Sequence, residues 1–146
     1  MKEKPISIEG IERVYSGKRI DLLKVHIKVG EYRTFKEVID FGEAVAILPI
    51  IDKNNVILIR QFRVPINRWI YEVPAGKVEE GETLEETAVR ELIEETGYRP
   101  KHLKKLISIY PTPGYSNEII HVFLAYDLES VSYTHLRAHE TSLHLV

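Results

Sequence analysis

Apolar residues recur along most of this chain at the alternating spacing of β-strands. Alternation over residues 20–29 and 32–39 predicts two strands, with a turn at Val29-Gly30-Glu31 between them. A largely apolar run over residues 43–51 predicts a further strand. We therefore expect the first forty or so residues to form a small β unit that precedes a separate domain.

Turn-forming residues separate the later strands. Asp52-Lys53-Asn54-Asn55 follows the apolar run and predicts a hairpin that returns through residues 56–63. A short strand that ends before Pro74-Ala75-Gly76 and two strands around the loop Pro111–Gly114 complete the pattern. These three predicted strands span residues 69–73, 103–110 and 119–128.

One segment, residues 83–96, has the apolar periodicity of an α-helix. Thr83 and Glu86 have the spacing of a capping box at its start, and Gly97 stands where a left-handed residue often ends a helix. The residues expected to face the core are Leu84, Ala88 and Leu92. Many strands with one central helix predict an α/β domain with a mixed sheet, preceded by a β extension.

Composition and charge set the general class of the protein. The 146 residues are enough for one domain, and 44% hydrophobic with 29% charged residues is ordinary for a globular protein. A net charge of -2 gives no basic field for nucleic acid, and the lack of cysteine excludes a disulfide framework and a thiol nucleophile. No apolar run approaches the roughly 20 residues of a membrane span, and the first residues do not form a signal peptide, so we expect a cytoplasmic location.

Three glutamates share one face of the predicted helix. Glu91, Glu94 and Glu95 are three and four residues apart, so their carboxylates repel one another at a cost to helix stability. A hard divalent cation held by oxygen ligands would compensate, and Arg90 can neutralise part of the cluster by a bidentate contact. We expect this acidic face to point out into a cleft, opposite the core stripe. The alternative is a solvated acidic helix without a ligand.

The spacing of the whole segment from Gly76 to Tyr98 favours a metal site. It follows the Nudix box, G-x5-E-x7-R-E-U-x-E-E-x-G-U with U apolar, and its seven fixed letters match by chance on the order of 10⁻⁸ times per start position. The chain therefore resembles the Nudix hydrolases, with one departure at Tyr98, where an aliphatic residue is usual. The matching residues are Gly76, Glu82, Arg90, Glu91, Leu92, Glu94, Glu95 and Gly97.

This resemblance implies a fold, a metal site and a reaction. The fold is an α/β/α sandwich in which the loop–helix–loop segment lies beside a mixed sheet. Glu91 and Glu95 are the implied main ligands of Mg²⁺ (or Mn²⁺), with Glu94 as a further ligand or base and the carbonyl of Ala75 completing a site. The implied reaction is hydrolysis of a diphosphate bond, with Glu94, Glu95 and Arg90 as catalytic residues.

Residues outside the box resemble the ADP-ribose pyrophosphatase subgroup of this family. Pro113 lies fifteen residues beyond Tyr98, where the subgroup has a marker proline. The resemblance implies hydrolysis of ADP-ribose to AMP and ribose 5-phosphate by a homodimer that exchanges its N-terminal β units. The alternatives are another nucleoside diphosphate sugar, a dinucleotide or a nucleoside triphosphate as substrate, or a nucleotide-binding sensor that has lost turnover. Further similarities to the subgroup are Ser16-Gly17-Lys18, Gln61-Phe62-Arg63, Glu72-Val73-Pro74-Ala75-Gly76 and the run Pro113–Glu118.

Four residues are candidates for contacts with this nucleoside diphosphate substrate. Phe35 is a candidate for stacking on the base, or else a strand residue buried in the dimer. Arg63 has the fork that suits phosphate oxygens, or else is a surface arginine. Glu72 contacts substrate or the metal shell, or pairs with an arginine, and Glu118 contacts the ribose region or shapes the Pro113 loop. His121 is expected to pack or bond a neighbour rather than to bind metal.

The last sixteen residues differ in character from the rest. VSYTHLRAHET, residues 131–141, is the translation of a transposase-based sequencing adapter in one frame, and we interpret residues 142–146 as index or unrelated sequence. We therefore interpret residues 131–146 as non-native read-through, residues 1–41 as the dimer-forming β extension and residues 42–130 as an incomplete Nudix domain. In many members of the subgroup a loop beyond this point carries a glutamate that acts as general base. Glu140 belongs to the adapter-like segment and receives no role.

Overall fold

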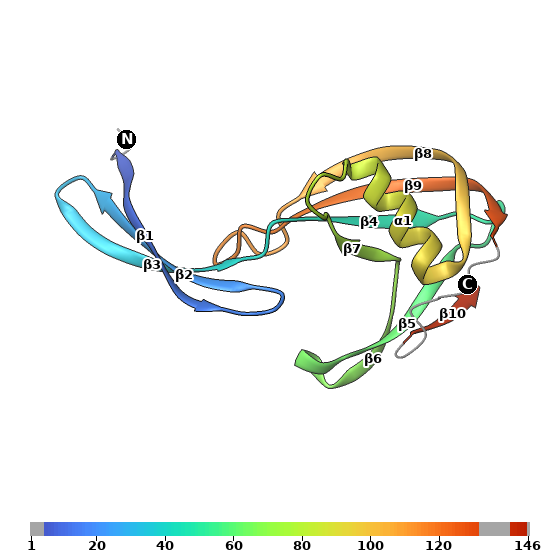
Figure 1. The fold of residues 1–146 in the computed structure, drawn as a ribbon, viewed down its shortest axis with the longest axis horizontal. Helices are drawn as coiled ribbons and strands as arrows, with labels where there is room; N and C mark the ends of the chain where they lie inside the picture. Colours follow the sequence, from blue (N-terminus) through green and yellow to red (C-terminus); the bar gives the residue numbers. More distant parts are fainter. Residues whose placement is uncertain (1–4, 132–140, 146) are drawn as a thin grey trace. The chain divides into compact units, whose positions relative to one another are not determined.

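A computed structural model of the protein describes residues 5–131 and the backbone of residues 141–145 (Figure 1). The chain divides into two compact units. The first contains Met1–Gly42 with Tyr110–Ile119, and the second contains Glu43–Ile109 with Ile120–Val146. The division after Gly42 lies beside the predicted boundary at residue 41. No sequence pattern had indicated that the loop Tyr110–Ile119 groups with the N-terminal unit.

The first unit is built on an antiparallel sheet of order β1-β2-β3. Its strands are β1 (Ile6–Ser16), β2 (Asp21–Val29) and β3 (Tyr32–Asp40), the blue strands of Figure 1. Strands β2 and β3 were predicted, and Gly30, with φ of 62°, forms the turn between them. Strand β1 was not predicted as a separate strand, because charged residues and a glycine interrupt its apolar pattern.

The second unit contains a sheet of order β7-β4-β9-β8 with one α-helix packed against it. Its strands are β4 (Glu43–Pro49), β7 (Ala75–Lys77), β8 (Tyr98–Ile109) and β9 (Ile119–Ser130), and the helix is α1 (Leu84–Thr96). Figure 1 shows α1 lying across one face of the sheet. The core between them consists of Val45, Ile47, Ala88, Leu92, Phe123 and Ala125. Two of the three predicted core residues of the helix are therefore fully buried, and the third, Leu84, packs against them.

Local signals explain where α1 begins and ends. The Thr83 hydroxyl accepts from the backbone N–H of Glu86, and the Glu86 side chain accepts from the backbone N–H of Thr83, so the predicted capping box is confirmed. Gly97, with φ of 74°, ends the helix in the predicted left-handed conformation. Within residues 5–131, α1 is the only α-helix, so one helical layer of the expected sandwich is present there. No helix in the described part of the chain is long and apolar enough to cross a membrane.

The predicted hairpin between residues 43–51 and 56–63 is wrong in its pairing. The turn forms, with the backbone N–H of Ile51 donating to the carbonyl of Asn55, but a single bridge joins Ile50 to Val56. Beyond that bridge the strands separate, because β5 (Ile57–Arg63) pairs with β6 (Arg68–Glu72) in another sheet. Both strands have buried apolar residues, and an apolar pattern predicts a strand but does not show which other strand it pairs with.

A third strand joins this smaller sheet from the end of the chain. β10 (Thr141–Leu145) pairs with β5, giving the order β10-β5-β6. These five residues lie in the segment that we interpret as read-through. Strand pairing uses backbone groups that every sequence carries, so the pairing does not bear on the origin of the segment. Glu140 lies outside the described residues.

Candidate functional site

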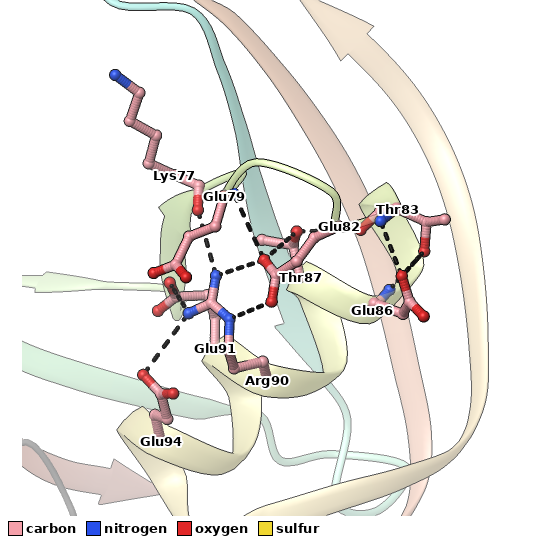
Figure 2. A network of polar contacts seen from close by, with 9 residues as sticks. All are labelled: Lys77, Glu79, Glu82, Thr83, Glu86, Thr87, Arg90, Glu91 and Glu94. Carbon is pink, nitrogen blue, oxygen red and sulfur yellow. Dashed lines mark hydrogen bonds and ion pairs between the residues drawn. The ribbon is translucent and has the colours of Figure 1, made fainter.

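Arg90, in the middle of α1, is the centre of a polar network that joins the helix to the loop before it (Figure 2). Its Nε and Nη2 donate to the two carboxylate oxygens of Glu82 at 2.7 and 2.8 Å. Nη1 donates to Glu91 at 2.7 Å and lies 3.6 Å from the carboxylate of Glu94. Nη2 also donates to the backbone carbonyl of Lys77 at 3.3 Å. One guanidinium therefore links the helix to the loop that precedes it and to two of the predicted metal ligands.

Glu82 holds Arg90 in place from the loop before the helix. Its carboxylate also accepts from the hydroxyl of Thr87 at 2.9 Å. The hydrogen bonds from Arg90, with those from Thr87 and the backbone of Glu79, lower the pKa of Glu82 from 4.5 to about 2, although partial burial acts in the opposite direction. From the sequence, Glu82 was identified only as a matching position of the Nudix box, without a role. No sequence pattern indicated that the fully buried Thr87 belongs to the site.

Glu91 is buried against the strand that precedes the loop. Glu91 is only 2% exposed, and a Cβ added at Gly76 would collide with the Glu91 carboxylate. The expectation that the whole acidic face points outward is therefore wrong for Glu91, whereas Glu94 and Glu95 are half-buried. The missing side chain at Gly76 makes the room, and the hydrogen bond from Arg90 compensates for the burial of charge.

Glu95 contacts strand β7 at Ala75, the residue before Gly76. Its carboxylate accepts from the backbone N–H of Ala75 at 3.0 Å, and Ala75 pairs with Ala46 of β4. Two adjacent residues of β7 therefore each contact one glutamate of the helix, Gly76 with Glu91 and Ala75 with Glu95. The predicted ligand atoms, three carboxylates and one carbonyl, belong to one short strand and one helix.

The donor chemistry of this site fits a hard divalent cation, because carboxylate and carbonyl oxygens are the ligands that Mg²⁺ binds. The lack of a side chain at Gly76 lets strand β7 lie directly against the carboxylate of Glu91. Among the described residues, no three acidic, histidine or cysteine side chains converge on a single point as they would around a metal ion. Arg90 contacts Glu91 and Glu94 there instead, so these two side chains would have to turn towards a cation.

Arg63 and Glu72 form a bidentate pair in the smaller sheet. Nε and Nη2 of Arg63 donate to the two oxygens of Glu72 at 2.7 and 2.6 Å. This bond, with a smaller contribution from the charges of Glu72 and Glu95, raises the pKa of Arg63. The arginine pairing given as one alternative for Glu72 is thus observed. Glu72 occupies the Nε–Nη2 edge of the guanidinium and leaves the Nη1–Nη2 edge, with the second hydrogen of Nη2, unused. Substrate contacts by either residue stay predictions.

Phe35 and Glu118 belong to the first unit, whereas all the other predicted site residues belong to the second. Phe35 is 47% exposed, with the ammonium of Lys24 4.3 Å from its ring centroid. Glu118 is half-buried, and burial raises the pKa of its carboxyl. The roles predicted for both residues stay predictions.

His121 contacts a neighbour, as expected. It is 6% exposed, and its Nδ1 lies 2.8 Å from the hydroxyl of Ser108 on the adjacent strand. Its Nε2 lies 3.8 Å from the carboxylate of Glu43. The histidine therefore forms part of a polar row across β4, β9 and β8 at the end of the core.

Sequence comparisons relate this chain to known proteins. A family model described as NUDIX domain matches residues 40–141. The ADP-ribose pyrophosphatase of Bacillus subtilis (strain 168) is 46% identical over 118 residues, which cover 80% of this chain and 64% of that protein. The methanol dehydrogenase activator of Bacillus methanolicus is 38% identical over 115 residues, 78% of this chain and 62% of that protein. The chain thus spans less than two thirds of these curated relatives.

A solved structure described as an ADP compounds hydrolase has the same fold. It matches with a TM-score of 0.86 over 99% of this chain and 80% of that chain, at 24% sequence identity. The predicted mixed architecture of strands around one helix is confirmed by this match.

Proposed function

Because this chain belongs to the NUDIX domain family, we propose that it hydrolyses the diphosphate bond of ADP-ribose, releasing AMP and ribose 5-phosphate. The observation that carries the proposal is the network in which Arg90 holds Glu82 and Glu91 beside the half-buried Glu94. The 46% identity to a protein named ADP-ribose pyrophosphatase supports the choice of substrate.

The proposed cofactor is Mg²⁺, with Mn²⁺ able to replace it. Glu91, Glu94, Glu95 and the carbonyl of Ala75 would hold the ion, and their oxygen chemistry fits it. When bound, the ion supplies positive charge to the diphosphate and lowers the pKa of a water molecule. Arg90 donates a hydrogen bond to the buried Glu91, and Glu82 holds Arg90 in place.

In the proposed reaction, the oxygen of one water molecule bonds to a phosphorus atom of the diphosphate. The bond from that phosphorus to the bridging oxygen breaks, and the displaced phosphate leaves with its sugar. Glu94 or Glu95 accepts the proton of the water, since both side chains are only half-buried, whereas Glu91 is buried. Arg90 is a positioning residue in this scheme, because it acts through Glu91.

The proposed substrate contacts are made by Arg63, Phe35 and Glu118. Arg63 would bind the diphosphate through the guanidinium edge that Glu72 leaves unused, so Glu72 orients the fork. Phe35 would stack on the base with its exposed surface, and Glu118 would accept hydrogen bonds from the ribose region.

We also propose that the protein is a homodimer that associates through its N-terminal sheet. Strand β1 carries large apolar side chains that are more than half exposed within one chain. Their exposed fractions are 69% for Ile6, 65% for Ile8 and 63% for Ile11. An apolar surface of this kind is typical of a protein interface.

Residues 131–146 are proposed to be non-native, and the natural gene product to continue differently after Ser130. The uninterrupted genomic reading frame beyond Ser130 tests this directly. As an alternative hypothesis for the general base, a glutamate in a loop of the natural product beyond Ser130, rather than Glu94 or Glu95, accepts the proton, and this 146-residue chain is then weak or inactive. Equal rates of Mg²⁺-dependent AMP release by both forms would defeat that hypothesis.

The experiment that tests the proposed function is a substrate profile of the natural gene product at fixed Mg²⁺. We expect the highest kcat/KM for ADP-ribose, because contacts with distal parts of a substrate decide specificity. The competing substrates are another nucleoside diphosphate sugar, a dinucleotide polyphosphate and a nucleoside triphosphate. A higher kcat/KM for any of these would contradict the substrate, and tight ADP-ribose binding without AMP release would identify a sensor.

A further inference from the structure

The loop Tyr110–Ile119 is attached to the end of strand β3 within the first unit. The backbone N–H of Ile39 donates to the carbonyl of Tyr115 at 2.7 Å, and the backbone N–H of Asn117 donates to the carbonyl of Ile39 at 3.3 Å. Ile39 also forms a parallel bridge with Ser116. The loop therefore continues the pairing of the N-terminal sheet for a short distance.

The side chain of Asn117 strengthens this attachment. Its Oδ1 accepts from the backbone N–H groups of Phe41 and Gly42 at 2.9 and 3.3 Å. Its Nδ2 donates to the carboxylate of Asp40 at 2.6 Å. An amide is needed for this set of contacts, because one group must accept two hydrogen bonds and donate another to an anion. These contacts fix the residue that immediately precedes Glu118.

Glu118 has the properties of a carboxylate held ready for a ligand. It is half-buried, and within residues 5–131 its carboxylate makes no hydrogen bond or ion pair. The backbone N–H of Glu118 donates to the hydroxyl of Ser116 at 3.1 Å. The preceding residue, Asn117, is held by Phe41, so the backbone that leads into Glu118 is fixed. Partial burial of a carboxylate without a partner costs free energy, and a ligand that donates hydrogen bonds would recover it.

We propose that Asn117 is a positioning residue for substrate binding, which places the Glu118 carboxylate by fastening its loop to the end of β3. This inference rests on the proposed function, in which Glu118 contacts the ribose region of ADP-ribose. The chemical group recognised is a hydroxyl-rich sugar next to a diphosphate.

The test is a double-mutant cycle with two isosteric changes in the natural gene product. Asn117→Asp keeps the acceptor for Phe41 and Gly42 but sets two carboxylates against each other at Asp40. Asp40→Asn is the matched control, since it still offers Asn117 an oxygen acceptor. In the double variant, the amide introduced at position 40 can donate to the carboxylate introduced at position 117, so the original contact is restored with the two groups exchanged.

We expect Asn117→Asp to raise the KM for ADP-ribose about fivefold to tenfold, with kcat within about twofold, because the box residues are unchanged. Asp40→Asn alone should stay near the wild-type KM, and the double variant should return to within about twofold of it. If Asn117→Asp does not fold, Asn117→Ala should raise KM in the same direction.

The outcomes separate this inference from the proposed function. A lower melting temperature and lower kcat at unchanged KM would show that Asn117 only stabilises the loop, and would overturn the inference. An unchanged KM in Asn117→Asp, or no rescue in the double variant, would also overturn it. If the wild type binds ADP-ribose without releasing AMP, the proposed hydrolysis fails, and the same cycle is then read from the Kd for ADP-ribose. If the wild type does not bind ADP-ribose, both proposals fail at the substrate.

Discussion

Gly76 and Glu91 are in contact between strand β7 and helix α1, and the contact leaves no room for a Cβ on the glycine. Glu91 is 2% exposed, so its carboxylate cannot move towards solvent to relieve a collision without losing its buried hydrogen bond from Arg90. The first glycine of the box therefore has a steric role. It allows a charged side chain to lie against a strand whose neighbouring residue, Ala75, donates to Glu95.

Gly76→Ala should lower the free energy of unfolding by about 1–3 kcal/mol, because an added methyl group overpacks this contact. It should also weaken activation by Mg²⁺ about 10–100-fold, since Glu91 would be displaced. Gly10→Ala is the control, because a Cβ there meets nothing within 4 Å. Denaturant unfolding and Mg²⁺ titration of AMP release measure the two effects. Equal stability of Gly76→Ala and Gly10→Ala would contradict the steric account.

The pair of Glu82 with Arg90 should make stability depend on pH. The pKa of Glu82 is lowered from 4.5 to about 2 in the folded chain, so its contribution is complete above pH 4.5 and is lost as pH falls towards 2. The free-energy difference between wild type and Glu82→Gln should therefore shrink over that range. Unfolding by denaturant at several pH values measures it.

Glu85→Gln is the matched control for this experiment, since Glu85 is exposed in the first turn of the same helix. We expect a difference from wild type that is small at every pH. A Glu82→Gln difference that stays constant from about pH 5 down to about 2 would be inconsistent with the ion pair.

Much of the helix could be predicted from the sequence, because its signals are local. The capping box of Thr83 and Glu86 and the left-handed Gly97 lie within one or two turns of the residues that they cap. The partners of Arg90 could not be predicted, because Glu82 reaches it only after the loop folds back over the helix. The spacing of the box marked both residues but not the bond between them.

Contacts between distant parts of the chain were beyond the sequence patterns. Asn117 bonds Asp40, which lies 77 positions earlier, and no local periodicity connects them. The separation of β4 from β5 was missed for a related reason. Alternation identifies each strand, and the turn between them suggested that they pair, but neither signal shows that β5 pairs with β6 in another sheet. The outward direction expected for Glu91 failed because helical spacing does not show that a glycine on another strand makes space.

Arg63→Lys should raise the KM for ADP-ribose and lower kcat/KM about tenfold. Lysine keeps the positive charge but cannot bond Glu72 and a phosphate through two edges of one planar group. Arg60→Lys is a matched control on the same strand, since its guanidinium lies over the ring of Trp69, 4.8 Å from the centroid. Steady-state kinetics of both variants decide the matter, and an equal effect of the two would refute the clamp.

The exposed apolar residues of β1 should be covered in a dimer. We expect light scattering of the natural gene product to give twice the mass of one chain, and Ile8→Lys with Ile11→Lys to give a monomer, because two charges would be buried in the interface. Glu31→Lys is the control, since its side chain is 99% exposed in a turn. A wild-type monomer at micromolar concentration would rule out this dimer.

The most direct measurement is AMP release from ADP-ribose as a function of Mg²⁺ by the natural gene product and by its Glu91→Gln, Glu95→Gln and Glu85→Gln variants. We predict that the wild type and Glu85→Gln release AMP only when Mg²⁺ is present. Glu91→Gln and Glu95→Gln should lose at least about a hundredfold in turnover and require more Mg²⁺. Unchanged turnover and unchanged cation affinity in both of these variants would contradict a catalytic metal site on this helix.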